Sequence, residues 1–256
     1  MTITSPHNDH LKEIRRLARR RERALSGRFV AEGEDLLAAA DAAGWPALER
    51  YVAAGSRLDG VEVEPDLLAS VSQLGSGTRA LGVYEQRWAP APSGPLCVAL
   101  HGIADPGNVG TILRSALAFG AASVALGPDC ADPYGPKAVR GSMGALFAVP
   151  LARYVEVGEL PGTVVALDAH AGESLADAMA AMTRAALAGR EPAPSALTLL
   201  IGAERAGLPD DALAAADRVV RIPIRSESLN AAMAATVALY EVTRGAVATD
   251  HRMPTP

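Results

Sequence analysis

The stretch that decides the fold runs from Leu199 to Glu241 and reads LLIGAERAGLPDDALAAADRVVRIPIRSESLNAAMAATVALYE. Its first residues end an apolar run, which predicts a buried strand. A glycine loop follows, and glycine allows the backbone to approach a ligand closely. A second β-branched run, Arg218 to Ile224, ends in a polar loop, and an alanine-rich helix follows to about Glu241. We expect these ends to converge on one crevice, because ligands of open α/β sheets lie beyond the carboxyl ends of strands.

Further strands and helices alternate before this stretch. Strands are predicted over residues 96–101, 122–126 and 163–168, and a helix is predicted from Asn108 to Phe119, preceded by a turn at Pro106 and Gly107. Asn108 would then cap the helix, with Arg114 about two turns further on, and a free helix N-terminus is suited to receive a phosphate. Taken alone, these two residues are better explained as a plain N-cap and a surface charge.

Three motifs of this region occur together, in order: NVGTILR (Asn108–Arg114), GAERAGL (Gly202–Leu208) and PIRSESLN (Pro223–Asn230). They resemble the motifs of the SpoU/TrmH class of RNA ribose 2′-O-methyltransferases in the SPOUT superfamily, and the resemblance covers roughly residues 96 to 245. It implies an α/β catalytic domain with a parallel sheet and a trefoil knot, S-adenosylmethionine as cofactor, and a homodimer formed through this domain. Composition and periodicity by themselves indicate no knot.

The same resemblance implies roles for particular residues. The residues expected to act in catalysis or substrate positioning are Asn108, Arg114, Glu204, Ser228 and Asn230; those expected to bind the cofactor are Leu167, Gly202, Gly207, Ile222 and Leu229. The family's arginine is assigned as a base, but a guanidinium stays protonated in proteins. We therefore expect Arg114 to anchor a neighbouring phosphate and to stabilise developing alkoxide charge. An exposed carboxylate is the ordinary alternative for Glu204.

Arginines gather near the N-terminus, where eight basic residues between Lys12 and Arg28 face only Glu13 and Glu22. One helix is predicted from His10 to about Leu25, with a cationic side and an apolar side formed at helical spacing by Leu11, Ile14, Leu17, Ala18 and Leu25. Such a side can neutralise RNA phosphates, although a solvated surface helix is the alternative. The residues expected to bind RNA are Arg15, Arg16, Arg19, Arg20 and Arg28, together with Arg140.

Short strands and helices alternate from Arg28 to Glu85 and predict a small α/β domain, with strands over residues 28–31, 48–54, 61–63 and 80–85. The segment RFVAEGEDLL resembles the start of a substrate-binding domain, similar to a ribosomal-protein RNA-binding fold, that many SpoU/TrmH enzymes carry. The sequence departs from that pattern at Gly77–Ala80, where the family often has Pro-Gln. Because the prolines of WAPAPSGP stiffen a chain, we predict an RNA-binding domain over residues 1–89, a linker over 90–95 and the catalytic domain over 96–256.

Composition narrows the function further. The net charge of −5 over 256 residues argues against a protein that simply coats nucleic acid. Two cysteines, no signal peptide and no apolar stretch of about 18 residues indicate a cytoplasmic protein without a membrane partner, and five scattered histidines predict no metal site. Ribosomal RNA is the favoured substrate, with tRNA left open. The alternatives are a non-catalytic RNA-binding protein of the same fold and an unrelated nucleotide-binding enzyme, which would need a Walker or GxGxxG loop.

Overall fold

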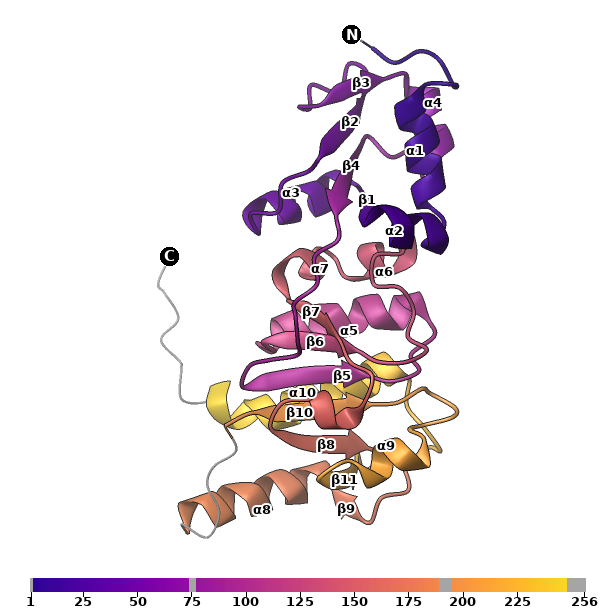
Figure 1. Cartoon of the computed structure of the whole chain (residues 1–256). Coiled ribbons are helices and arrows are strands. Elements are labelled where there is room, and N and C mark those ends of the chain that lie inside the picture. The colour runs from indigo at the N-terminus through magenta and orange to yellow at the C-terminus, as the bar shows by residue number, and fades with distance from the viewer. Residues whose placement is uncertain (1, 74–76, 189–194, 248–256) are drawn as a thin grey trace, which may run out of the picture. The chain divides into compact units, whose positions relative to one another are not determined.

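The computed structural model describes residues 2–73, 77–188 and 195–247 (Figure 1). Contacts divide the chain into two compact units. The first comprises Met1–Arg87, Pro106–Arg114 and Ala131–Ala148, and the second comprises Trp88–Asp105, Ser115–Cys130 and Val149–Pro256. Each unit combines segments that are distant along the chain. The domain boundaries predicted at residues 89 and 95 therefore stay a prediction.

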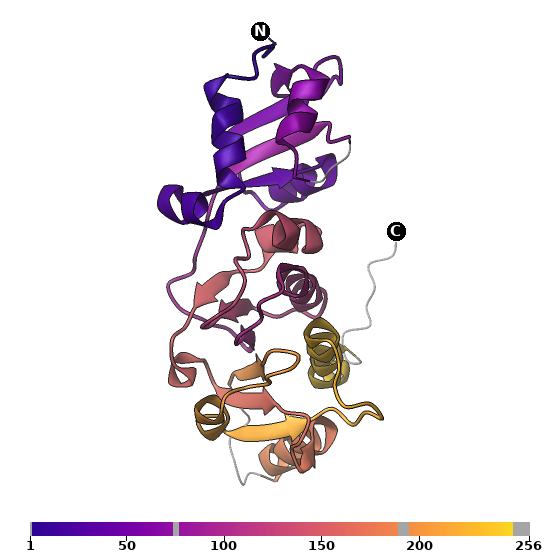
Figure 2. The ribbon, with the colours of Figure 1, turned by 90° about the vertical axis from the view of Figure 1, so that its right-hand side faces the viewer.

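The first unit is built on a four-stranded sheet of order β1-β4-β2-β3. Its strands are β1 (Arg28–Glu32), β2 (Glu49–Ala53), β3 (Val61–Val63) and β4 (Ala80–Glu85), with β4 antiparallel to both β1 and β2. Figure 2 shows α1 (Asp9–Leu17) and α4 (Pro65–Val71) side by side over one face of this sheet. Leu11, Ile14 and Leu17 bury the apolar side of α1 there, as their helical spacing requires.

The opposite face of the same sheet carries an aromatic cluster, because alternate residues of a strand point to opposite faces. Phe29 and Tyr84 lie there, and their rings are 6.1 Å and 5.2 Å from that of Phe147. Three helices of the first unit, α3 (Glu34–Ala42), α6 (Pro136–Gly141) and α7 (Ala145–Ala148), contribute to this side. The first unit therefore contains two short helices from the region that matches the methyltransferase motifs.

The predicted single basic helix is wrong: the structure has two helices, α1 and α2 (Arg20–Ser26). The guanidinium of Arg23 is the physical reason. Its Nη1 donates hydrogen bonds of 2.8 Å to the carbonyls of both Leu17 and Ala18, the last carbonyls of α1, which otherwise would lack partners. Leu25, predicted to face the core, is instead 74% exposed.

The second unit is built on a seven-stranded sheet of order β7-β6-β5-β10-β8-β11-β9. Every pairing in it is parallel, which confirms the predicted α/β fold with a parallel sheet; the knot stays a prediction. The strands are β5 (Leu96–Leu100), β6 (Ser123–Leu126), β7 (Leu151–Arg153), β8 (Thr163–Leu167), β9 (Glu173–Ser174), β10 (Leu197–Ile201) and β11 (Arg218–Arg221). The apolar runs of the central strands β5, β6, β8 and β10 are almost entirely buried, as strands covered on both faces of a parallel sheet require.

Helices complete the second unit. They are the C-terminal end of α5 (Pro106–Ala118), then α8 (Leu175–Leu187), α9 (Asp210–Ala214) and α10 (Ala231–Val247), with a short 3₁₀ turn, η1 (Val157–Glu159). The helix α10 packs against β10 and α8. Among the described residues, no helix is long and apolar enough to span a membrane.

The start of α5 differs from the prediction. The helix begins at Pro106, so Asn108 lies in its first turn and is not its N-cap, and the predicted cap is wrong. Proline suits the first position of a helix because its fixed φ is helical and its missing N–H would have no intrahelical partner there. The predicted turn at Pro106 and Gly107 is therefore already helical.

Candidate active site

The carboxyl ends of three neighbouring strands, β10, β8 and β11, open into a pocket of about 780 Å³. Leu167 ends β8, Gly202 follows β10 and Ile222 follows β11, and all three line the pocket. The loop with Ser228 and Leu229 and the first turns of α10 form the rest of the wall. This volume falls in the range of pockets that enclose small ligands and cofactors.

The glycine loop after β10 is closed by its own backbone. Ala203 and Gly207 exchange two main-chain hydrogen bonds, of 3.2 Å and 2.9 Å. A Cβ atom on Gly202 would lie 2.5 Å from the carbonyl carbon of Gly207 and 2.7 Å from the nitrogen of Leu208, so no other residue fits. Gly207 has a φ of +67°, a conformation that side chains rarely adopt. Both predicted cofactor-binding glycines thus shape a tight turn that lines the pocket.

Glu204 joins this loop to the start of α10. Its carboxylate accepts hydrogen bonds from the side-chain amide of Asn230 and, at 3.3 Å, from the main-chain N–H of Ala231. Asn230 in turn caps α10, because its Oδ1 accepts from the N–H groups of Ala232 at 3.0 Å and Met233 at 3.2 Å. Two of the three motifs that are predicted to act together, GAERAGL and PIRSESLN, therefore meet through hydrogen bonds.

Charged side chains surround the pocket. Its lining includes four carboxylates, one guanidinium and one imidazole: Asp168, Glu204, Asp210, Glu227, Arg205 and His170. Asp168 follows β8 and is held there by the N–H of His170, which donates to its Oδ1 at 3.2 Å. The excess of negative charge favours a ligand with positive charge. The described residues contain no group of three or more His, Cys, Asp or Glu that could bind a metal ion.

Asn108 and Arg114, the other two residues predicted to act in catalysis, belong to the first unit, whereas the pocket belongs to the second. Arg114 is exposed on α5 and Asn108 is half-buried. Between them, Val109, Ile112 and Leu113 are fully buried. The buried side of α5 thus holds the helix in place and leaves the guanidinium of Arg114 accessible.

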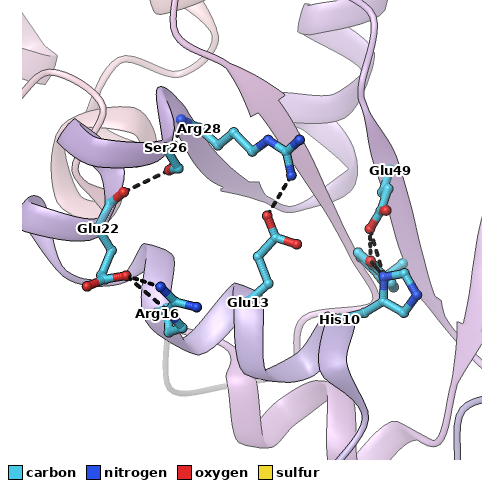
Figure 3. A network of polar contacts seen from close by, with 8 residues as sticks. His10, Glu13, Arg16, Glu22, Ser26, Arg28 and Glu49 are labelled. Carbon is cyan, nitrogen blue, oxygen red and sulfur yellow. Dashed lines mark hydrogen bonds and ion pairs between the residues drawn. The ribbon is translucent and has the colours of Figure 1, made fainter.

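The predicted RNA-binding arginines fall into two groups. In the first group, Arg16 pairs with Glu22 at 2.6 Å and Arg28 pairs with Glu13 at 2.8 Å (Figure 3). The same view includes a separate contact between His10 and Glu49, which are 3.1 Å apart. Arg15 is half-buried and donates to the carbonyl of Pro6 and the hydroxyl of Ser70. The second group, Arg19, Arg20 and Arg140, is exposed and forms no ion pair with any described residue.

The sequence shows Glu13 and Glu22 beside this cluster, but it did not predict that they pair with Arg28 and Arg16, nor that Arg23 is buried. Its side chain is 5% exposed and contacts Asp132 at 2.7 Å. The spacing in the sequence could have indicated this role. Arg23 follows Leu17 and Ala18 by six and five residues, so its side chain can reach back to their carbonyls at the end of α1.

Two family models match the chain. A model of the SpoU rRNA Methylase family matches residues 95–240, and a model of the MRM3-like substrate binding domain matches residues 8–85. The chain belongs to the SpoU rRNA methylase family. This confirms the resemblance that the three motifs and the RFVAEGEDLL segment predicted.

Individual members of the SpoU family extend the match over nearly the whole chain. The 23S rRNA (uridine(2479)-2′-O)-methyltransferase of Streptomyces viridochromogenes is 30% identical over 261 residues, which cover 89% of this chain and 86% of that protein. The 23S rRNA (guanosine(2553)-2′-O)-methyltransferase of Bacillus subtilis is 26% identical and covers 94% and 98%. The crystal structure of an AdoMet-bound rRNA methyltransferase from Sinorhizobium meliloti is similar with a TM-score of 0.80 at 30% identity, covering 96% and 98%.

Proposed function

We propose that this protein transfers a methyl group from S-adenosylmethionine to a ribose 2′-hydroxyl of ribosomal RNA. The observation that carries the proposal is the pocket at the carboxyl ends of β8, β10 and β11, lined by the glycine and serine motifs of the SpoU family. Two relatives are named as 23S rRNA 2′-O-methyltransferases and one similar structure is named as AdoMet-bound, which supports both the substrate and the cofactor.

The pocket fits S-adenosylmethionine in size, polarity and charge. Leu167, Ile222 and Leu229 offer apolar surface to the adenosine part, and the tight turn at Gly202 exposes backbone for hydrogen bonds. The surrounding carboxylates complement the positive charges of a sulfonium and an amino group. When bound, this cofactor supplies a methyl group that is activated for transfer to a nucleophile. We assign its binding to Leu167, Gly202, Gly207, Ile222 and Leu229.

The protein's own residues hold the reactants. Glu204 and Asn230 keep the glycine loop and the start of α10 together. We assign to Ser228, an exposed residue that lines the same pocket, a part in positioning the substrate. We assign to Arg114, assisted by Asn108, the binding of the neighbouring RNA phosphate and the stabilisation of alkoxide charge. The 2′-hydroxyl proton then leaves through phosphate or water, because a guanidinium stays protonated.

We assign RNA binding to the arginines of the first unit, with residues 1–89 acting as the substrate domain and 90–95 as the linker. Arg19, Arg20 and Arg140 contribute most, because their charges are not countered by any described carboxylate within ion-pair distance. Arg15, Arg16 and Arg28 contribute less, since each already has a partner in the protein.

A homodimer through α10 completes the proposal. Ala231, Ala232, Ala235 and Ala238 of this alanine-rich helix are buried within their own subunit, so they are not the surface that a partner meets. The exposed side of the helix instead carries Met233, Val237 and Tyr240, at helical spacing, and Tyr240 contacts the ring of Phe119 at 6.4 Å. A second copy packed on this apolar side would let Arg114 of the partner subunit act at the pocket.

Two measurements test the proposed reaction. Calorimetry should detect binding of S-adenosylmethionine, and tritium from the labelled methyl group should appear in ribosomal RNA at a nucleotide whose 2′-hydroxyl becomes blocked. Absence of binding, or label in tRNA alone, would contradict the proposal. The role of Arg114 is tested with Arg114→Lys, since activity near wild type at all pH values would exclude a bidentate phosphate contact. Light scattering of Val237→Glu should show monomers if the dimer forms through α10.

A further inference from the structure

The buried ion pair between Arg23 and Asp132 joins two parts of the first unit that are distant in the sequence. Arg23 is only 4% exposed, and its Nε and Nη2 donate to Oδ2 of Asp132 at 2.9 Å and 2.7 Å. Its Nη1 meanwhile binds the carboxyl end of α1. The nitrogens Nε, Nη1 and Nη2 of this guanidinium all bind groups of the protein itself. Arg23 therefore does not serve as a phosphate contact, unlike the exposed arginines of α2.

The segment that begins with Asp132 is fixed by further contacts in the same unit. Oδ1 of Asp132 accepts a hydrogen bond of 2.9 Å from the N–H of Tyr134, whose ring lies 4.8 Å from that of Phe29 on β1. The hydroxyl of Tyr134 donates to the main-chain carbonyl of Arg87 and accepts a hydrogen bond of 3.1 Å from the main-chain N–H of Arg87. The loop ahead of α6 is thus held by contacts with Arg23, Phe29 and Arg87.

The helix α6 then makes backbone contact with α5. A Cβ atom on Gly110 would lie 2.5 Å from the carbonyl oxygen of Ala138 and 2.9 Å from Cα of Gly141, so the two helices meet without an intervening side chain. Closely packed interiors transmit displacement, because no space exists to absorb it. A shift of α6 must consequently move the part of α5 that carries Asn108 and Arg114.

We infer that Arg23 is a positioning residue for methyl transfer: through Asp132 and α6 it sets the place of Asn108 and Arg114 on α5. The inference rests on the proposed function, because it assigns a task to Arg23 within that reaction. It adds that the buried member of the arginine cluster acts on the rate of the chemical step, whereas its exposed neighbours act on RNA affinity.

The test compares Arg23→Met, Asp132→Asn, the double variant, and Arg21→Met as a control on an exposed arginine of the same helix. Asp132→Asn is the milder change, since it retains an acceptor for the N–H of Tyr134. Arg23→Met and Asp132→Asn should each slow single-turnover methylation at saturating RNA roughly 10- to 100-fold, the effect of a misplacement remote from the reacting atoms. The double variant should be no slower than the slower single variant, because both residues act through one contact.

Two binding measurements separate positioning from general damage. The affinity for S-adenosylmethionine should be unchanged in all variants, since none of these residues lines the pocket. RNA affinity should fall in Arg21→Met and stay constant in Asp132→Asn. Equal rates in Asp132→Asn and wild type, or a loss of rate explained by weaker binding of either substrate, would overturn the inference.

Hydrogen exchange of the amides of residues 108–114 gives a readout without catalysis. We expect faster exchange there in Asp132→Asn than in wild type or Arg21→Met, and unchanged exchange would also overturn the inference. If wild type neither bound S-adenosylmethionine nor methylated RNA, the proposed function would fail by itself, and the exchange data would still decide whether the ion pair holds α5.

Discussion

The carboxylate of Glu204 accepts a hydrogen bond from the side-chain amide of Asn230, which ties the glycine loop after β10 to the N-cap of α10. Asn230→Ala removes both this bond and the cap, and should lower the free energy of unfolding by about 1 kcal/mol. Asn230→Asp retains the cap but places two carboxylates together, so it should weaken binding of S-adenosylmethionine.

Exchanging the two groups provides the control for that prediction. In Glu204→Gln combined with Asn230→Asp, the amide and the carboxylate trade places and the hydrogen bond can form in reverse. We expect calorimetry to show that this double variant binds S-adenosylmethionine better than Asn230→Asp alone. Equal weakening in both would mean that the Glu204–Asn230 bond does not organise the pocket.

Gly202→Ala should open the glycine loop, because the new Cβ would meet backbone atoms that cannot move aside independently. Overpacking of this kind costs roughly 1–3 kcal/mol, and if the loop must close on the cofactor this corresponds to about a 5- to 150-fold loss of affinity. The matched control is Gly172→Ala in the same unit, where a Cβ has nothing within 4 Å. Similar affinities in the two variants, measured by calorimetry, would exclude the tight turn as a determinant.

The exposed arginines of the first unit should control the salt dependence of RNA binding. Replacing both Arg19 and Arg20 by Gln removes two phosphate contacts, so the slope of log affinity against log salt should decrease in magnitude by roughly 1.4 to 1.8. Arg184→Gln, an exposed change on α8, is the control and should leave the slope as it is. Filter binding over a range of salt concentrations measures both, and an unchanged slope in the double variant would place the RNA elsewhere.

The two cysteines predict a fall in stability at alkaline pH. Cys97 and Cys130 are free and buried, and burial raises the pKa of both thiols. The folded state then disfavours the thiolate, so this contribution is complete below the unfolded pKa of about 8.5 and is lost as the pH rises above it. Each thiol should reduce the free energy of unfolding by up to about 1.4 kcal/mol one pH unit higher. Urea unfolding of the Cys97→Ala and Cys130→Ala double variant should lack this fall.

A buried tyrosine provides a test of packing in the first unit. The hydroxyl of Tyr84 is buried and, among the described residues, it is without a hydrogen-bond partner; burial raises its pKa to about 12. Tyr84→Phe should leave the free energy of unfolding unchanged or raise it, because an unsatisfied polar group is removed. Tyr154→Phe, which breaks a bond of 3.2 Å to the carbonyl of Leu100, should instead lower it by about 1 kcal/mol. If Tyr84→Phe lowered the free energy of unfolding as much as Tyr154→Phe does, the Tyr84 hydroxyl would have a hydrogen-bond partner after all, which would contradict this prediction.

Most strands of both sheets could be predicted from periodicity, because a strand buried on both faces has to be apolar throughout. Val61–Val63 and Ala80–Glu85 agree residue for residue with β3 and β4, whereas the strand predicted to Ile224 ends at Arg221. Pro223 explains that shorter strand, since proline cannot donate to a sheet ladder. The short β9 and α9 were not predicted, because so few residues carry no recognisable period.

The candidate site was predictable where its parts follow strand ends and unpredictable where they depend on distant partners. The predicted residues Gly202, Gly207 and Glu204 after β10 line one pocket, and Asn230 after β11 is hydrogen-bonded to Glu204. The break between α1 and α2, the first turn of α5 and the buried alanines of α10 could not be read in the same way. Arg23, which binds the end of α1, is itself fixed by the distant Asp132, and α10 packs against β10 and α8. The first turn of α5 instead follows from Pro106 at its first position.

By itself, the sequence determined the fold class, the order of the motifs and the chemical types of side chain present at each strand end, because local periodicity and strand direction are properties of neighbouring residues. Only the tertiary structure decided which arginines remain exposed, that Arg23 is buried against Asp132, and that α6 and part of α5 belong to the same compact unit as the N-terminal sheet. The physical reason is that burial and charge pairing depend on which distant groups meet, and a single guanidinium is equally suited to water, phosphate or carboxylate until folding selects its partner.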